Sequence, residues 1–303
     1  MADISTTNLD AGADSPRLAR TELLATVQRV NDLAATTSGK GSELVADIEP
    51  VTGAVAINLR KYILDSGQYS VMGFVPDASK AAIRAKTSTT DISAYVQDAL
   101  DAAIADDRGL MFPRGRYVAP GLVVNSYSGS GLRIDGAGAV IRLGANETGL
   151  SIIGSERVYL GRGLRFDSTA ASGLSQIGVL VTNSARLEIA GEYELLTYGV
   201  QVASTKTGIS TGAYPIPLRL SPIVRACAAG VYCAATGEYV EILGANVTDC
   251  TLYGAVIDAG NVKILGGQFS GNDVAIQYDG SNSTNGDHGA INAVTVNHNA
   301  KAG

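Results

Sequence analysis

The sequence has no tryptophan, and only 17% of its 303 residues are charged. Its formal net charge is −6, whereas a nucleic-acid-binding protein shows a basic patch, so nucleic acid is not an expected partner. No run of about 18 apolar residues is present, which predicts no membrane insertion. The first residues also lack the basic and apolar segments of a secretory signal peptide.

Cysteine and histidine are also scarce. The three cysteines, Cys227, Cys233 and Cys250, are odd in number and lie in apolar runs, so we expect buried free thiols and folding in a reducing cytoplasm. The two histidines, His288 and His298, form no pattern typical of metal ligands. The sequence therefore predicts no metal site and no cofactor.

Glycine, in contrast, is abundant, with 36 residues, and residues 131–303 contain an imperfect internal repeat. Apolar segments typical of short strands recur at intervals of about 20 to 30 residues, separated by turn residues. One turn of a parallel β-helix, with three short strands and three corners, needs about that many residues. We therefore expect a mainly β fold, a parallel β-helix over 131–303.

Aligning the repeats predicts which residues stack from one turn to the next. One inward-facing ladder is expected from Val158, Leu187, Leu218, Val240, Val262 and Ile291. A second inward ladder is expected from Ile152, Val181, Val202, Cys233 and Ile257. The same alignment places Cys227 and Cys250 in neighbouring turns.

The position one residue after the first ladder faces outward, because side chains alternate along a strand. This outward ladder reads Tyr159, Glu188, Arg219, Glu241, Lys263 and Asn292. Its charged members alternate in sign, so we expect opposite charges to pair between neighbouring turns. Four residues after the first ladder stand residues suited to tight corners, namely Gly191, Pro222, Gly244 and Gly266.

Three polar insertions, 168–176, 204–216 and 279–289, lengthen particular turns of the repeat. In solenoids such insertions gather on the binding face, but each of these is also open to being a plain surface loop.

Residues 1–42 have a different pattern. The turn-prone residues Asn8 and Leu9 precede a predicted helix, which Asp14 or Ser15 caps and Pro16 begins. The apolar positions that recur along this helix include Leu23, Val27 and Val30. Such an apolar stripe needs a partner: the rest of the chain, copies of the same helix, or another protein.

Residues 43–130 are predicted to be a linker and a mixed lead-in to the β-helix. A helix is expected over about 91–106, capped by Thr90 or Asp91. Its apolar face is predicted from Ile92, Val96, Ala99, Ala103 and Ile104. A strand, a tight turn at Arg114–Gly115 and a second strand follow. The earlier stretch QYSVMGFVPDAS predicts a short strand that leads into a loop.

Two segments resemble a known family. TTNLDAGADSPRLARTELLATVQRVNDL is similar to the N-terminal segment of tail fibre and tailspike proteins of tailed bacteriophages. DISAYVQDALDAAIADDRGLMFPRGRYVAPGLVV resembles the start of the pectate-lyase-like, right-handed β-helix of tailspikes, a start that secreted polysaccharide lyases and hydrolases share. The matching residues are Asp91, Gln97, Ala99, Leu100, Asp101, Phe112, Pro113, Gly115 and Tyr117. The D-F-G-A and G-D-G-x-x-D-D stretches that usually precede this helix are replaced by SVMGFVPDASKAAIRAKTSTTD.

The resemblance implies a homotrimeric tail spike or fibre, made in the bacterial host cytoplasm and built into the virion. It implies that residues 1–42 anchor the chain to a phage tail protein such as an adaptor, nozzle or baseplate. The anchoring residues it implies are Asn8, Leu9, Asp14, Pro16, Leu23, Val27 and Val30. The β-helix is implied to bind or cleave a host surface polysaccharide.

Cleavage by glycoside hydrolysis needs two carboxylates that flank the scissile bond. Candidate carboxylates are Asp167, Glu192, Glu194, Asp249, Asp258 and Asp273, none of which lies in a recognised motif. Asp249 and Asp273 fall in neighbouring turns and are the pair we single out, whereas Glu188 and Glu241 are explained by the charge ladder. Enzyme activity therefore stays open, and a role without catalysis is favoured.

Three functions remain: a virion attachment protein, which the N-terminal segment favours; a polysaccharide depolymerase, either a hydrolase or a lyase, of the β-helix fold; and a purely structural adaptor between tail and outer fibre. Because no capping segment follows the last predicted strand, we expect the protein to continue beyond Gly303.

Overall fold

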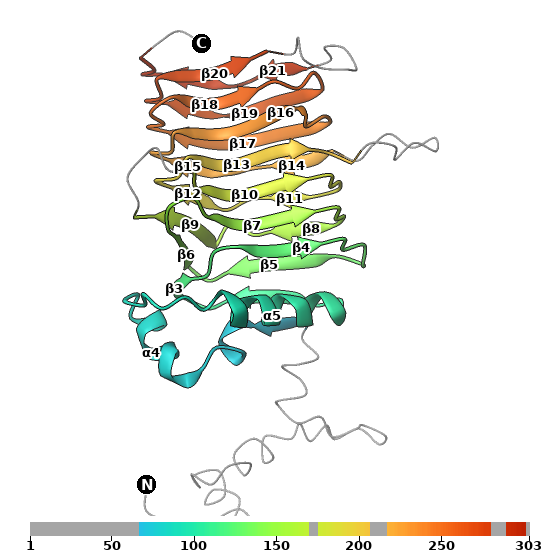
Figure 1. Cartoon of the computed structure of the whole chain (residues 1–303). Helices are drawn as coiled ribbons and strands as arrows, with labels where there is room; N and C mark the ends of the chain where they lie inside the picture. Colours follow the sequence, from blue (N-terminus) through green and yellow to red (C-terminus); the bar gives the residue numbers. More distant parts are fainter. Residues whose placement is uncertain (1–66, 170–174, 207–216, 280–288, 301–303) are drawn as a thin grey trace, which may run out of the picture. The chain divides into compact units, whose positions relative to one another are not determined.

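The computed structural model describes residues 67–169, 175–206, 217–279 and 289–300. Figure 1 shows a stack of strands that winds through about seven turns, and every strand pair between turns is parallel. The expected mainly β fold, a parallel β-helix, is confirmed. The residues predicted to anchor the chain, Asn8, Leu9, Asp14, Pro16, Leu23, Val27 and Val30, lie outside the described residues.

The strands of each turn lie on three faces, which we call the first, second and third sheets. The first sheet contains β1 (Gln68–Ser70), β2 (Gly109–Phe112), β5 (Leu132–Gly136), β8 (Val158–Leu160), β11 (Glu188–Ile189), β14 (Leu218–Leu220) and β21 (Ala290–Asn292). The second contains β3 (Gly115–Val118), β6 (Ala139–Leu143), β9 (Leu164–Ser168), β12 (Glu192–Glu194), β15 (Ile223–Arg225) and β22 (Thr295–Asn297).

Two longer strands, β17 (Val240–Thr248) and β19 (Val262–Ser270), run through the corner between the first and second sheets and join them. The third sheet contains β4 (Leu122–Asn125), β7 (Thr148–Ile153), β10 (Ile177–Thr182), β13 (Tyr198–Ser204), β16 (Ala229–Thr236), β18 (Tyr253–Ile257) and β20 (Val274–Tyr278).

The first predicted ladder is confirmed from Val158 to Val262. Strand register aligns Leu218 with Val240 and Val240 with Val262, and all five of these apolar residues are buried. The prediction for Ile291 is wrong, because this residue pairs with Ile264 and is 52% exposed. A shift of two residues preserves the alternation of inward and outward side chains, so the apolar pattern alone does not distinguish the two registers.

The second predicted ladder is confirmed in full by the register of the third sheet. Its members belong to one continuous apolar core that fills the inside of the stack. Within this core the rings of Phe166 and Tyr193 stack in neighbouring turns, with centroids 5.6 Å apart. Each fully buried valine, leucine or isoleucine side chain of this core contributes about 1.5–3 kcal/mol to the free energy of unfolding.

Helix α5 (Ser93–Ala105) lies across one end of the stack, as Figure 1 shows, and matches the helix expected over about 91–106. It buries Val96, Ala99, Leu100 and Ala103. Its Gln97 side chain accepts a hydrogen bond from the Val123 backbone N–H at 2.9 Å and donates one to the Val123 carbonyl at 3.0 Å. The amide thereby satisfies the backbone of β4, which pairs with β7 alone in the described part of the chain.

Other residues of the resemblance motif also serve this end of the stack. The Tyr117 hydroxyl donates to the Pro113 carbonyl at 2.7 Å, and the Tyr117 ring packs edge-on against Phe112. The expected cap is misplaced, because Ile92 is the residue that precedes the helix. Asp91 instead accepts hydrogen bonds from the backbone and hydroxyl of Ser93.

The stretch before α5 contains more structure than expected. The short strand is β1, which is followed by the 3-10 helix η2 (Val71–Gly73). The predicted loop then contains helix α4 (Asp77–Arg84). The sequence contains little sign of this helix, because Ile83 is its one buried residue. An Asp77–Lys80 ion pair of 2.7 Å supports its first turn.

The corners of the stack follow the predicted spacing in part. Gly191, Gly244 and Gly266 have positive φ values of 130°, 57° and 71°, and the value of 130° at Gly191 is one that only glycine adopts readily. Pro222 lies at the corner between β14 and β15. The three insertions leave the stack at two different corners: 168–176 between β9 and β10, the others between the third and first sheets. The insertions therefore do not gather at one place.

Candidate functional site

The outer face of the first sheet contains two adjoining hollows of about 420 Å³ and 320 Å³, which we call the first-sheet groove. Both hollows are lined by Tyr159, Glu188 and Arg219. These residues lie one above another, because Glu188 is in register with Tyr159 in the turn before and Arg219 in the turn after. The groove therefore follows the direction in which the strands stack.

The predicted charge ladder runs through this groove. Arg219 lies 3.5 Å from a carboxylate oxygen of Glu188 and 3.5 Å from one of Glu241, so the pairing of opposite charges between turns is confirmed here. Lys263 is in register with Glu241, but no ion pair joins them within the described residues. The predicted last member, Asn292, is wrong, because Ala290 pairs with Lys263. The Glu188 and Arg219 side chains are 56% and 48% exposed, so their pair contributes less than about 1 kcal/mol.

The groove carries an excess of positive charge. Two carboxylates, Asp135 and Glu188, line it. The arginines that line it are Arg133, Arg157, Arg162, Arg186 and Arg219. The groove is thus locally positive, although the chain as a whole has a net charge of −6.

These arginines differ in how they are held. Arg133 forms an ion pair of 2.5 Å with Asp135. One end of the Arg157 guanidinium donates to the Gly129 carbonyl at 3.1 Å, and no carboxylate pairs with it in the described part of the chain. Arg162 is exposed and has no side-chain partner among the described residues.

Among the described residues, Arg186 has one carboxylate partner, which it shares with a lysine. Glu156 lies 3.5 Å from Arg186 and also accepts a hydrogen bond from Lys206 at 2.5 Å. The hydrogen bond from Lys206, together with the charges around it, holds the pKa of the Glu156 carboxyl below its ordinary value. The Nε atom of Arg186 is buried and has no hydrogen-bond partner.

The sequence predicted Tyr159, Glu188 and Arg219 as an outward ladder, not as a binding site, and the arginines beside them were missed. Arg157 and Arg186 occupy equivalent corners of neighbouring turns, with φ values of 57° and 55°. Their position in the repeat could have identified them, since each arginine directly precedes a ladder residue, Val158 or Leu187.

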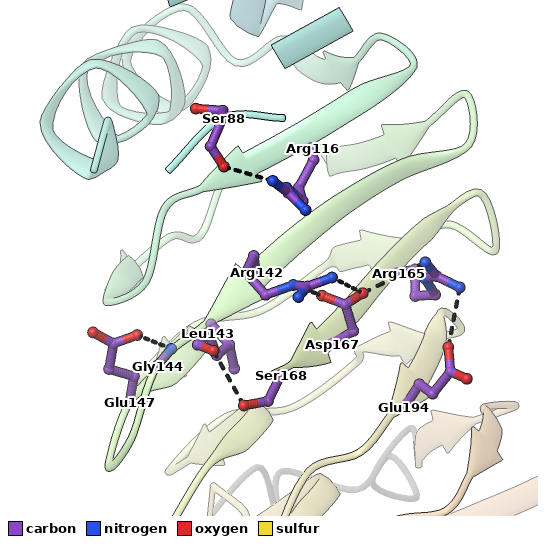
Figure 2. A network of polar contacts seen from close by, with 10 residues as sticks. All are labelled: Ser88, Arg116, Arg142, Leu143, Gly144, Glu147, Arg165, Asp167, Ser168 and Glu194. Atoms are coloured by element: carbon purple, nitrogen blue, oxygen red, sulfur yellow. Dashed lines mark hydrogen bonds and ion pairs between the residues drawn. The ribbon is translucent and has the colours of Figure 1, made fainter. Parts of the chain in front are cut away.

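The outer face of the second sheet is also charged, as Figure 2 shows. Arg142 donates to both carboxylate oxygens of Asp167, at 2.6 Å and 3.0 Å. Arg165 lies between Asp167, at 3.4 Å, and Glu194, at 3.0 Å. The Asp167 side chain is only 6% exposed, and the hollow beside Glu194 measures about 160 Å³. Arg142, Arg165, Asp167 and Glu194 thus bind one another, whereas Arg116 donates to the Ser88 carbonyl at 3.0 Å and Glu147 accepts from the Gly144 N–H.

Asp249 and Asp273, the predicted catalytic pair, lie at the same corner in neighbouring turns. Asp249 directly follows β17, and its N–H donates to the Ser270 carbonyl at 3.0 Å. Asp273 follows β19, and its N–H donates to the Cys250 carbonyl at 3.1 Å. The register thus offsets the two aspartates by two residues. Their catalytic role stays a prediction.

The other candidate carboxylates are held in different ways. Asp167 and Glu194 form the ion pairs of the second sheet, and Asp258 accepts a hydrogen bond from the Tyr232 hydroxyl at 3.1 Å. Glu192 is exposed on β12.

The three cysteines are free and buried, as predicted, and Cys227 and Cys250 lie in neighbouring turns. Burial raises the pKa of both Cys233 and Cys250 to about 12, which keeps their thiols protonated. No group of three or more histidines, cysteines, aspartates and glutamates is placed to hold a metal ion in the described ranges. Within those same ranges, no helix has the length and apolar character needed to cross a membrane.

Three solved structures are similar to this chain. Tailspike protein 3 of bacteriophage CBA120 matches over 86% of this chain and 57% of its own, with 12% identity and a TM-score of 0.31. The Dettilon tailspike protein matches over 84% and 66%, with 11% identity and a TM-score of 0.24. The ORF18 protein of Geobacillus virus E2 matches over 78% and 62%, with 15% identity and a TM-score of 0.21.

The chain therefore spans less than two thirds of the length of each of these three proteins. No protein-family model matches the sequence, and no curated protein does.

Proposed function

We propose that this chain is a bacteriophage tail spike or fibre protein that binds a host surface polysaccharide with its β-helix. The observation that carries the proposal is the first-sheet groove, in which a tyrosine stands among arginines. The groove extends along the stack over at least three turns, from Tyr159 to Arg219. An extended groove suits a chain-like ligand better than a compact one.

The chemistry of the groove also supports a glycan ligand. A tyrosine ring offers an apolar face together with a polar hydroxyl, which suits a sugar ring that is apolar on its faces and polar at its edge. Arginine presents five N–H donors in a fixed plane, and sugar hydroxyls and carboxylates are hydrogen-bond acceptors. A few directed polar groups within a partly apolar hollow are typical of ligand sites.

The proposal includes the assembly that the N-terminal resemblance implies. We propose a homotrimer, made in the bacterial host cytoplasm, whose residues 1–42 attach it to a tail protein of the virion. The resemblance at residues 91–124 supports the fold and not the binding role, because Gln97, Tyr117 and their neighbours serve the end of the stack.

The binding role is tested with the purified 303-residue chain and a panel of bacterial surface polysaccharides. We expect saturable binding to at least one of them, and weaker binding after Tyr159→Ala. Failure to bind any polysaccharide of the panel, or to adsorb to any of the bacteria from which the panel is prepared, contradicts the proposal. Release of shorter oligosaccharides identifies a depolymerase instead, and Asp249→Asn and Asp273→Asn are then the variants that test the catalytic pair.

The attachment role is tested in phage particles. Deletion of residues 1–42 is expected to remove the chain from purified particles, while the isolated protein keeps the circular dichroism of a β fold. Particles that retain the shortened chain contradict this role.

A further inference from the structure

The first-sheet groove contains arginines whose positive charge the protein does not balance. Arg133 and Arg219 have carboxylate partners within the groove, namely Asp135 and Glu188. Arg157 and Arg162 have none among the described residues, and Arg186 shares Glu156 with Lys206. A groove that bound only neutral sugars would not need this excess.

Two of these arginines also lie close enough together for their positive charges to repel each other. An isolated bridge pairs Glu156 with Ala185, so the next residues, Arg157 and Arg186, stand at equivalent positions of neighbouring turns. Neighbouring parallel strands lie about 4.8 Å apart, and like charges directly opposite each other are destabilising. Glu156 offsets part of this repulsion, since both arginines lower the pKa of its carboxyl, but Lys206 adds a further positive charge beside it. A ligand carboxylate would offset the remaining positive charge.

The arginines are oriented as well as charged. The Arg157 guanidinium is fixed at one end by the Gly129 carbonyl, which leaves its remaining donors for a ligand. Arg186 donates to Glu156 at 3.5 Å, and Glu156 is shared with Lys206, so the charge of Arg186 is only partly offset. A guanidinium binds a carboxylate through two parallel hydrogen bonds, and such charge-assisted bonds are about twice as strong as neutral ones.

We infer that the first-sheet groove binds an acidic polysaccharide, through carboxylate groups on its sugars that pair with Arg157, Arg162 and Arg186. Tyr159 lies at the centre of the groove and contacts the apolar face of a sugar ring. This inference rests on the proposed function and specifies the chemical class of the glycan. The net charge of −6 repels any polyanion, but it repels a nucleic acid most because a nucleic acid carries a charge on every phosphate. A glycan whose carboxylates are more widely spaced is therefore favoured over a polynucleotide.

The inference is tested with the full chain on an array of acidic and neutral bacterial polysaccharides, followed by titration of the best binder. We expect an acidic polysaccharide to bind best. Reduction of its carboxyl groups to alcohols is expected to weaken binding by about tenfold or more, since it removes charge-assisted hydrogen bonds. Binding is also expected to weaken as salt concentration rises.

Two variants locate the effect in the groove. Arg157→Gln and Arg162→Gln are each expected to lower affinity about tenfold for the acidic polysaccharide and less than twofold for its carboxyl-reduced form. The matched control is Arg225→Gln, an exposed arginine of the second sheet, which is expected to change neither affinity more than twofold. Melting temperatures of Arg162→Gln and Arg225→Gln should equal that of the parent protein, because neither side chain has a partner among the described residues. Arg157→Gln also loses the hydrogen bonds to the Gly129 and Ser128 carbonyls and is expected to lower the melting temperature slightly, so Arg162→Gln is the cleaner test.

The contradicting outcomes are distinct. Best binding to a neutral polysaccharide, or equal binding before and after carboxyl reduction, overturns this inference and leaves the proposed function standing. Tighter binding of a single-stranded oligonucleotide than of any polysaccharide overturns both. Arg225→Gln lowering affinity as much as Arg162→Gln places the ligand on the second sheet and also overturns the inference.

Discussion

The outer faces of the first and second sheets contain the same kinds of charged residues in the same stacked register, but their charges have different partners. On the second sheet, Asp167 is almost fully buried and holds Arg142 with two short hydrogen bonds. On the first sheet, the Glu188 and Arg219 pair is about half exposed and joined at 3.5 Å. Both sheets contain arginines without a carboxylate among the described residues, namely Arg157 and Arg162 on the first and Arg116 and Arg225 on the second. The difference therefore lies in the ion pairs, since the Arg142–Asp167 pair of the second sheet is short and partly buried, whereas the Glu188–Arg219 pair of the first-sheet groove is long and exposed.

The comparison predicts its largest effect at Asp167. Asp167→Ala leaves Arg142 and Arg165 without a carboxylate between them. Because these arginines are 22% and 37% exposed, the expected cost is about 2 kcal/mol, less than for a fully buried ion pair. Urea denaturation of the variant and of the parent protein measures this difference in the free energy of unfolding.

The matched change on the first sheet is Glu188→Ala, which is expected to alter the free energy of unfolding by less than about 0.5 kcal/mol because the pair is exposed. Equal losses at both positions contradict the distinction between the two faces.

Much of this fold follows from the sequence. The apolar alternation identified the stacked ladders, and even the pairing of Arg219 with Glu188, because a solenoid repeats one local pattern in every turn. The register failed at Ile291, where the segment 280–288 separates the strand from the preceding turn and a shift of two residues keeps the alternation. Helix α4 was not predicted, because Ile83 is the one residue that it buries and a single apolar residue does not indicate a helical face.

The site was less predictable than the fold. Arg157 and Arg186 lie at corners, where no alternation of apolar and polar residues applies, and their importance depends on which carboxylates lie near them. Arg142 and Arg157 are the same residue type in sequence, yet one is satisfied by Asp167 and the other is not. Only the three-dimensional arrangement separates them.

A second effect is expected at the corner between the two faces. A side chain added at Gly163 would place its Cβ 1.7 Å from the Gly136 carbonyl oxygen of the neighbouring turn. Because backbone must shift to relieve this clash, Gly163→Ala is expected to lower stability by about 2 kcal/mol.

The corner effect is measured by thermal and urea unfolding. Gly73→Ala is the control, since a Cβ there meets nothing within 4 Å, and it is expected to be nearly neutral. A neutral Gly163→Ala would show that the two faces are not held at a close backbone contact.

The smallest effect concerns pH at the edge of the first-sheet groove. The pKa of Glu156 is held down by the hydrogen bond from Lys206, so the folded state binds its proton at a lower pH than the unfolded state does. The stabilisation is therefore present above the ordinary glutamate pKa of about 4.3 and is lost as pH falls below it through the lower folded value.

This contribution is expected to be less than about 1 kcal/mol. Urea unfolding of the parent protein and of Glu156→Gln, at neutral pH and at about pH 3, measures it. The parent should lose more stability on acidification than the variant, and Glu192→Gln, on an exposed residue of β12, serves as the control. Identical pH profiles for the parent and Glu156→Gln contradict the role of the Lys206 contact.

The proposed ligand-binding face is the first sheet and not the second. A crystal structure of the full chain with a fragment of its bound polysaccharide distinguishes the two faces. We expect a sugar against the Tyr159 ring, with a carboxylate between Arg157 and Arg186. An ordered sugar over β9, β12 and β15, with the first-sheet groove empty, would show that the second sheet binds the ligand.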